Sequence, residues 1–207
     1  MLPANVNIVL TGENLPVQAI AVSDFKFNGR PLRETVRFPM GLNAETQGAS
    51  LQILPDRIQI LVTEVTNIAA DATHLQEMIA PIFDYIGPKS FKGVGHNAQF
   101  VLDPLIPKSA VAKSILNVSE IANILSGDVE ESNISVFRHI PNGAMLRTTF
   151  STQTPVDRIV MEFNAHFDVS GSSARDAISC LKESLDTMAA IVDRAQGSLL
   201  AEKLGSK

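Results

Sequence analysis

The hydrophobic and polar positions divide the chain into two strand-rich segments, and a helix follows each of them. Short apolar runs in the first third are separated by turn residues. Among these are Asn28-Gly29, which tolerates positive φ, and Pro55-Asp56, in which proline presets φ. The last third shows the same pattern around Pro141-Asn142-Gly143. We expect strands over 7–10, 17–27, 32–38, 49–54, 57–65, 90–102, 134–140, 144–150 and 158–169.

Two longer helices are predicted from apolar residues at helical spacing. Over 73–86, apolar side chains recur at offsets of 0, 3, 4, 7, 8 and 11 from the first of them. Asp71 or Thr73 can cap this helix, and Pro81 should kink it or shift its boundary. The second helix runs from 172 to 195 or beyond, and its apolar residues are spaced alternately by three and four positions, like a heptad repeat.

The two segments also share an order of elements. Gly48-Ala49-Ser50-Leu51-Gln52 leads to Asp56-Arg57-Ile58 and helix 73–86, while Gly143-Ala144-Met145-Leu146-Arg147 leads to Asp157-Arg158-Ile159 and helix 172–195. The shared residues are few, so a chance resemblance stays open. We predict an α+β fold, a mostly antiparallel sheet with helices on one face and a two-fold internal repeat of strand-strand-helix units.

The domain boundary follows from a proline-containing stretch over 103–108. It separates a first unit, 1–102, from a second unit, 109–207, which begins with a short predicted helix over 109–125. Because that stretch can be either a loop or a linker, one continuous domain is equally compatible with the sequence.

Composition and charge narrow the function classes. Hydrophobic residues make up 45% of the 207 residues and charged residues 19%, as in globular proteins. The net charge of -5 disfavours nucleic-acid binding. No apolar run approaches the roughly 18 residues needed to span a bilayer, and the first residues lack the features of a signal peptide. The single cysteine, Cys180, excludes an internal disulfide and fits a reducing compartment, so we expect a cytoplasmic protein.

The strand over 161–169 carries the most distinctive candidate chemistry. Strict alternation puts apolar residues on one face and Glu162, Asn164, His166 and Asp168 on the other. A row of carboxylate and imidazole groups can orient a general base or bind a divalent metal. The alternative is an ordinary solvated face of an antiparallel sheet, which requires the same alternation.

Gly93, Gly95 and His96 form a second candidate site. Glycines in a strand allow close backbone approach or a bulge, but the motif lacks the further residues of a dinucleotide or phosphate loop. In a regular strand, His96 shares its face with apolar residues, so it is either a buried structural histidine or a catalytic one. His74 and His139 have no partner at metal-ligand spacing, and we expect both at the surface. The sequence predicts no metal, cofactor or catalytic nucleophile.

Two functional hypotheses follow. The first is a non-enzymatic binding or assembly protein that forms homo-oligomers or joins a larger complex, through helix 172–199 or an open sheet edge. Its interaction residues on the helix would be Leu185, Met188, Val192 and Leu199. The alternative is a small-molecule-binding domain or enzyme with a pocket between sheet and helices. Its polar groups would be His96, His166, Glu162 and Asp168.

Overall fold

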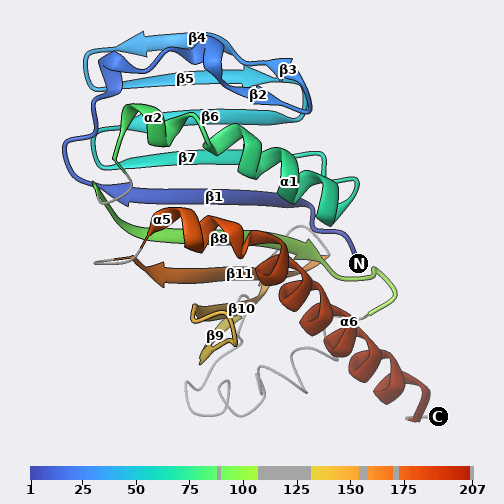
Figure 1. Ribbon diagram of the computed structural model, residues 1–207. Coiled ribbons are helices and arrows are strands. Elements are labelled where there is room, and N and C mark those ends of the chain that lie inside the picture. The colour runs from blue at the N-terminus through green and yellow to red at the C-terminus, as the bar shows by residue number, and fades with distance from the viewer. Residues whose placement is uncertain (88–89, 107–131, 154–157, 170–172, 206–207) are drawn as a thin grey trace.

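The chain forms one nine-stranded antiparallel sheet with helices on one face (Figure 1). The computed structural model describes residues 1–87, 90–106, 132–153, 158–169 and 173–205. The strand order is β4-β5-β6-β7-β1-β8-β11-β10-β9. The strands are β1 (Asn5–Gly12), β4 (Arg33–Phe38), β5 (Gly41–Thr46), β6 (Ala49–Leu54), β7 (Arg57–Val62), β8 (Phe91–Val101), β9 (Ser132–His139), β10 (Met145–Gln153) and β11 (Arg158–Asp168).

The two sequence units meet in the middle of this sheet. The first strand of the chain, β1, pairs with β7 on one side and with β8 on the other. β8 lies on the first-unit side of the boundary expected at 102, yet it pairs with both β1 and β11. The hydrogen-bonded sheet is therefore continuous from the first unit into the second.

Within the described residues, four α-helices cover one face of the sheet, and the core lies beneath them (Figure 1). They are α1 (Ile68–Ile79), α2 (Ile82–Tyr85), α5 (Ala174–Ser179) and α6 (Leu181–Gly205). On β1 the core-facing residues Val6, Ile8 and Leu10 are completely buried. Burying one such side chain contributes about 1.5–3 kcal/mol. The predicted α+β class, with a mostly antiparallel sheet, is confirmed.

The first helix begins earlier than its apolar stripe predicts. Asn67 is the N-cap, and its side-chain oxygen accepts a hydrogen bond from the backbone N–H of Ala70 at 3.0 Å. The Asp71 carboxylate accepts from the backbone N–H groups of Thr66 and Asn67 at 2.9 and 3.0 Å. The predicted start at 73 is wrong because capping, rather than apolar periodicity, sets the first turn. The interruption expected at Pro81 is confirmed, since α1 ends before it and α2 follows it.

The strand predicted over 17–27 is wrong. This segment forms two 3₁₀ turns, η1 (Val17–Ala19) and η2 (Val22–Asp24), and then the short strand β2 (Lys26–Phe27). Its buried residues do not alternate, so a regular strand could not have buried them all. β2 forms a hairpin with β3 (Arg30–Pro31) across Asn28 and Gly29, which both have positive φ as predicted.

The strand β5, by contrast, was not predicted. In β5, Leu42 and Ala44 are the two residues with apolar side chains, and both are buried in the core. So short an alternation gives a weak pattern, which explains why the sequence did not indicate a strand there.

The apolar stripe of the last helix packs within the chain. Leu185, Met188 and Val192 are 0% exposed and Leu199 is 2% exposed. These four residues belong to the core, so they do not offer an exposed interaction surface as the first hypothesis expected. A short break at Cys180 separates α5 from α6. The helix predicted over 109–125 lies outside the described residues.

Candidate functional site: an amide array on the open face of the sheet

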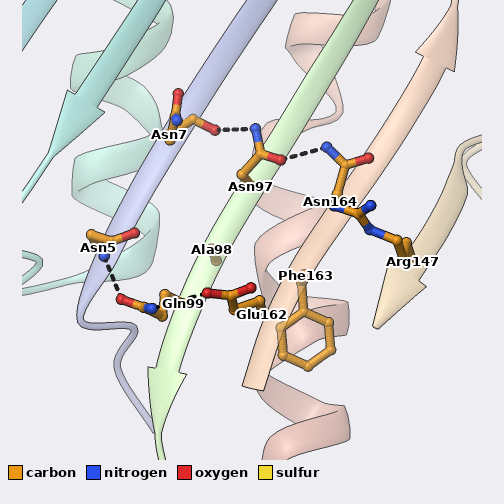
Figure 2. A pocket seen from close by; sticks show the side chains of 9 residues that line it. All are labelled: Asn5, Asn7, Asn97, Ala98, Gln99, Arg147, Glu162, Phe163 and Asn164. Carbon is orange, nitrogen blue, oxygen red and sulfur yellow. Dashed lines mark hydrogen bonds between the residues drawn. The ribbon is translucent and has the colours of Figure 1, made fainter. Parts of the chain in front are cut away.

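The face of the sheet opposite the helices is polar at its centre. The alternation predicted over 161–169 is confirmed, since Phe163, Ala165 and Phe167 are buried on the helix-covered side. Glu162 and Asn164 point to the opposite face, which we call the open face. The neighbouring strands β1 and β8 add further amide side chains to it (Figure 2).

Strand register aligns these side chains in two rows across the sheet. In the first row, Asn7 of β1 lies opposite Asn97 of β8, Asn97 lies opposite Asn164 of β11, and Asn164 lies opposite Arg147 of β10. In the second row, Asn5 of β1 lies opposite Gln99 of β8, and Gln99 lies opposite Glu162 of β11. We call these seven residues the amide array.

Hydrogen bonds hold the first row in place (Figure 2). The Asn164 side-chain amide donates to the Asn97 side-chain oxygen, and the Asn97 amide donates to the backbone carbonyl of Asn7 at 3.2 Å. The side-chain oxygen of Asn7 is shielded from solvent and has no hydrogen-bond partner. An unpaired buried acceptor is uncommon and costs about 1–3 kcal/mol.

The second row is linked in the same way. Asn5 donates to Gln99 at 2.9 Å, and Gln99 donates to the Glu162 carboxylate at 3.2 Å. The array lines a hollow of about 240 Å³. Among the described residues, the guanidinium of Arg147 at its border has no hydrogen-bond or ion-pair partner.

Gly93 and Gly95 make room on this face for neighbouring side chains. A Cβ atom at Gly93 would lie 2.8 Å from Cε1 of His166 and 2.9 Å from Oγ1 of Thr11. A Cβ atom at Gly95 would lie 3.4 Å from the side-chain nitrogen of Asn164. Side chains of β1 and β11 therefore lie close to the backbone of β8 at these glycines, where the sequence suggested close backbone approach or a bulge.

His96 lies on the other face, beneath the helices. It is 0% exposed, and its Nδ1 is 3.0 Å from the hydroxyl of Ser184, which also accepts a hydrogen bond from the side chain of Asn142. Its ring packs against that of Phe167, while its Nε2 has no partner. Burial disfavours the charged imidazolium and lowers the pKa of His96 to about 3. The buried, hydrogen-bonded reading of His96 fits these contacts.

The sequence hypothesis had missed Ser184 and Asn142. Ser184 stands three positions after Leu181, on the apolar stripe of α6, so a polar residue at a core position was the available signal. Asn142 also accepts a hydrogen bond from the backbone N–H of Ala144, which ties the turn after β9 to α6.

The four candidate groups of the pocket hypothesis do not come together. His96 faces the helices, whereas Glu162, His166 and Asp168 alternate with the core residues of β11 and face the other way. A shared pocket between sheet and helices is therefore excluded for this set. His139 is exposed, as expected, but His74 is half-buried and lies edge-on to the ring of Phe27.

The described residues contain neither a cluster of metal ligands nor a membrane-spanning helix. Their His, Cys, Asp and Glu side chains do not gather in groups of three or more that could hold a metal ion. None of the helices described is both long and apolar enough to cross a bilayer.

No protein-family model matches the chain, and no curated protein is significantly similar to it in sequence.

The two glycines of β8 should respond differently to a methyl group. Gly93→Ala forces the exposed ends of the His166 and Thr11 side chains to move, and we expect it to lower the free energy of unfolding by about 1 kcal/mol. Gly95→Ala meets only ordinary or slightly tight contacts, and we expect a change within about 0.5 kcal/mol. Urea denaturation of both variants measures this, and equal losses would contradict the close approach at Gly93.

Burial of His96 should make stability depend on pH. The pKa of His96 is about 3 in the folded protein and near 6.5 in the unfolded chain. Below pH 6.5 only the unfolded chain binds the proton, so the free energy of unfolding is unaffected above pH 6.5 and falls as the pH is lowered towards 3. The expected slope is about 1.4 kcal/mol per pH unit. Urea denaturation of the wild type and of His96→Gln between pH 8 and pH 4 separates the pH dependence caused by His96 from that caused by the carboxylate side chains, which both proteins share. Parallel pH profiles for the two proteins would rule out a buried neutral histidine.

Proposed function

We propose that the protein is a non-enzymatic assembly protein that pairs with a second copy of itself through the edge strand β9. The observation that carries this proposal is the exposure of apolar side chains on β9. Ile134, Val136 and Phe137 are 38%, 50% and 64% exposed. β9 ends the strand order and pairs only with β10 among the described strands. An open edge with apolar side chains favours pairing with another strand.

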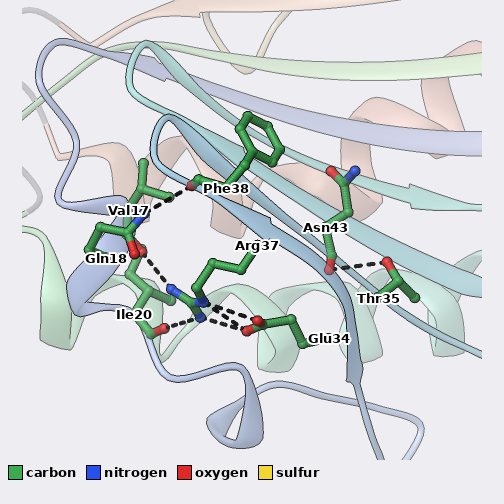
Figure 3. A network of polar contacts seen from close by, with 8 residues as sticks. All are labelled: Val17, Gln18, Ile20, Glu34, Thr35, Arg37, Phe38 and Asn43. Carbon is green, nitrogen blue, oxygen red and sulfur yellow. Dashed lines mark hydrogen bonds and ion pairs between the residues drawn. The ribbon is translucent and has the colours of Figure 1, made fainter.

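The opposite edge of the sheet, β4, is protected against such pairing (Figure 3). Its register shifts between Glu34 and Val36, as at a β-bulge. The side chain of Gln18 donates to the backbone carbonyls of Phe38 and Pro39 at 3.0 and 3.2 Å. Bulges and occupied backbone groups are devices that block edge pairing.

Charges protect the β4 edge further. Arg37 is 2.7 Å from Glu34 and donates to the backbone carbonyls of Val17 and Ile20 at 3.3 and 3.0 Å, which ties the preceding loop to β4. The hydrogen bond from Arg37 lowers the pKa of Glu34 below its usual value, so the pair stays charged. Apolar exposure alone does not distinguish the edges, since Val36 and Phe38 of β4 are 50% and 38% exposed. The register shift and the contacts of Gln18 and Arg37 distinguish β4 and support β9 as the interface.

A second copy suits β9 because the strand is self-complementary. An antiparallel pair centred on Ser135 sets Ile134 of each copy opposite Val136 of the other, on the same face of the sheet. The two Arg138 side chains then lie six residues apart along the strands, roughly 20 Å, so their like charges are not opposed. The result would be a continuous sheet through both copies.

We infer that the internal repeat expected from the sequence relates the two halves. The hairpin β6-β7 followed by α1 and the hairpin β10-β11 followed by α5 and α6 have the same order. Each hairpin returns beside an earlier strand, since β7 pairs with β1 and β11 pairs with β8. A cytoplasmic location stays a prediction of the sequence.

Matched substitutions on the two edges test the interface. Val136 on β9 and Val36 on β4 are both 50% exposed. Wild type should show a mass of twice 22.3 kDa by light scattering. We expect Val136→Lys to weaken dimerisation by about tenfold or more, because a lysine on an edge strand opposes pairing and a loss of about 1.4 kcal/mol raises the Kd tenfold. Val36→Lys should leave dimerisation unchanged. A wild type that stays at 22.3 kDa over the whole concentration series would refute the proposal, as would equal dissociation of both variants.

A further inference from the structure

We propose that the hollow in the amide array binds a small zwitterion of the α-amino acid class. The site is separate from β9 and does not depend on the proposed assembly. Apart from Ala98 and Phe163 its lining residues are polar, and two of them carry opposite charges, Arg147 on β10 and Glu162 on β11. No ion pair joins these two side chains, whose charges are therefore available to a bound molecule.

The spacing of the two charges suits a ligand that carries both signs. Glu162 lies opposite Thr149, two residues along β10 from Arg147, so the two are diagonal neighbours. Diagonal side chains on paired antiparallel strands are about 7–8 Å apart. A carboxylate on the ligand can pair with the guanidinium of Arg147, whose fork geometry matches it, while the ammonium group pairs with Glu162.

The amides supply the remaining polar contacts. In the first row, the side-chain amides of Asn97 and Asn164 use part of their hydrogen-bonding capacity within the array, which holds their orientation. In the second row, Asn5 donates to Gln99 and Gln99 donates to Glu162, which holds these side chains in the same way. Side chains held in this way need little reordering when a ligand binds.

Size and charge narrow the class of ligand. The hollow of about 240 Å³ is below the usual range for drug-sized ligands, roughly 300–1,000 Å³. With one guanidinium and one carboxylate at its border, the site favours a molecule of zero net charge over a polyanion. A free α-amino acid meets both conditions.

Titration of the whole protein with the twenty common L-α-amino acids tests the proposal. Binding is followed by the side-chain amide resonances of Asn97, Gln99 and Asn164 in NMR spectra, with acetate and butylamine as probes of one charge each. We expect at least one amino acid to shift these resonances with millimolar affinity and both single-charge probes to bind at least about tenfold more weakly.

Charge-removing variants give the matched comparison. Arg147→Gln and Glu162→Gln should each weaken binding by about tenfold or more, while Arg57→Gln, an exposed residue on β7, should leave it unchanged. The proposal is overturned if no amino acid shifts the array resonances up to about 10 mM. It is also overturned if binding persists undiminished in Arg147→Gln and Glu162→Gln. Neither result would bear on the light-scattering test of β9.

Discussion

The packing of helices on a single face of the sheet determines where every strand residue can act. Successive side chains of a strand point to opposite faces, so the helix-covered side takes one residue of each pair and the open face takes the other. On β8 this separates His96, which is buried beneath α6, from its neighbour Asn97 in the amide array. Shifting one strand by one residue would move its apolar side chains to the open face and its polar side chains into the core. Burial of the apolar side chains therefore also fixes the positions of the amide array.

Among the described strands, β4 and β9 are the two edges of the sheet, and the chain treats them differently. The loop between β1 and β2 wraps against β4 and binds it through Gln18 and Arg37. On β9 the described side chains from Ile134 to His139 are all exposed. An open sheet must manage both edges, which is why we propose β9 as the place for association.

Local patterns in the sequence predicted much of the sheet, because alternation and turn residues are local signals. The alternation around Asn164 and the turn at Asn28-Gly29 are examples that the structure confirms. The separation of His96 from His166 follows from the same alternation, since His96 shares its strand face with apolar residues and His166 does not. The pairing of β8 with β11 could not be predicted, because some 60 residues separate the two strands. The stripe with Leu185 shows a related limit. Heptad spacing indicates an apolar helix face, but it does not distinguish the chain's own core from a partner.

Hydrogen exchange along β9 tests the assembly account most directly. In a β9 pair, the alternate backbone amides that point away from β10 become hydrogen-bonded to the second copy. The account predicts that these amides, around Ser135, are protected at concentrations where the dimer forms and lose protection on dilution. Amides that exchange rapidly at every concentration, while those pointing to β10 stay protected, would contradict it.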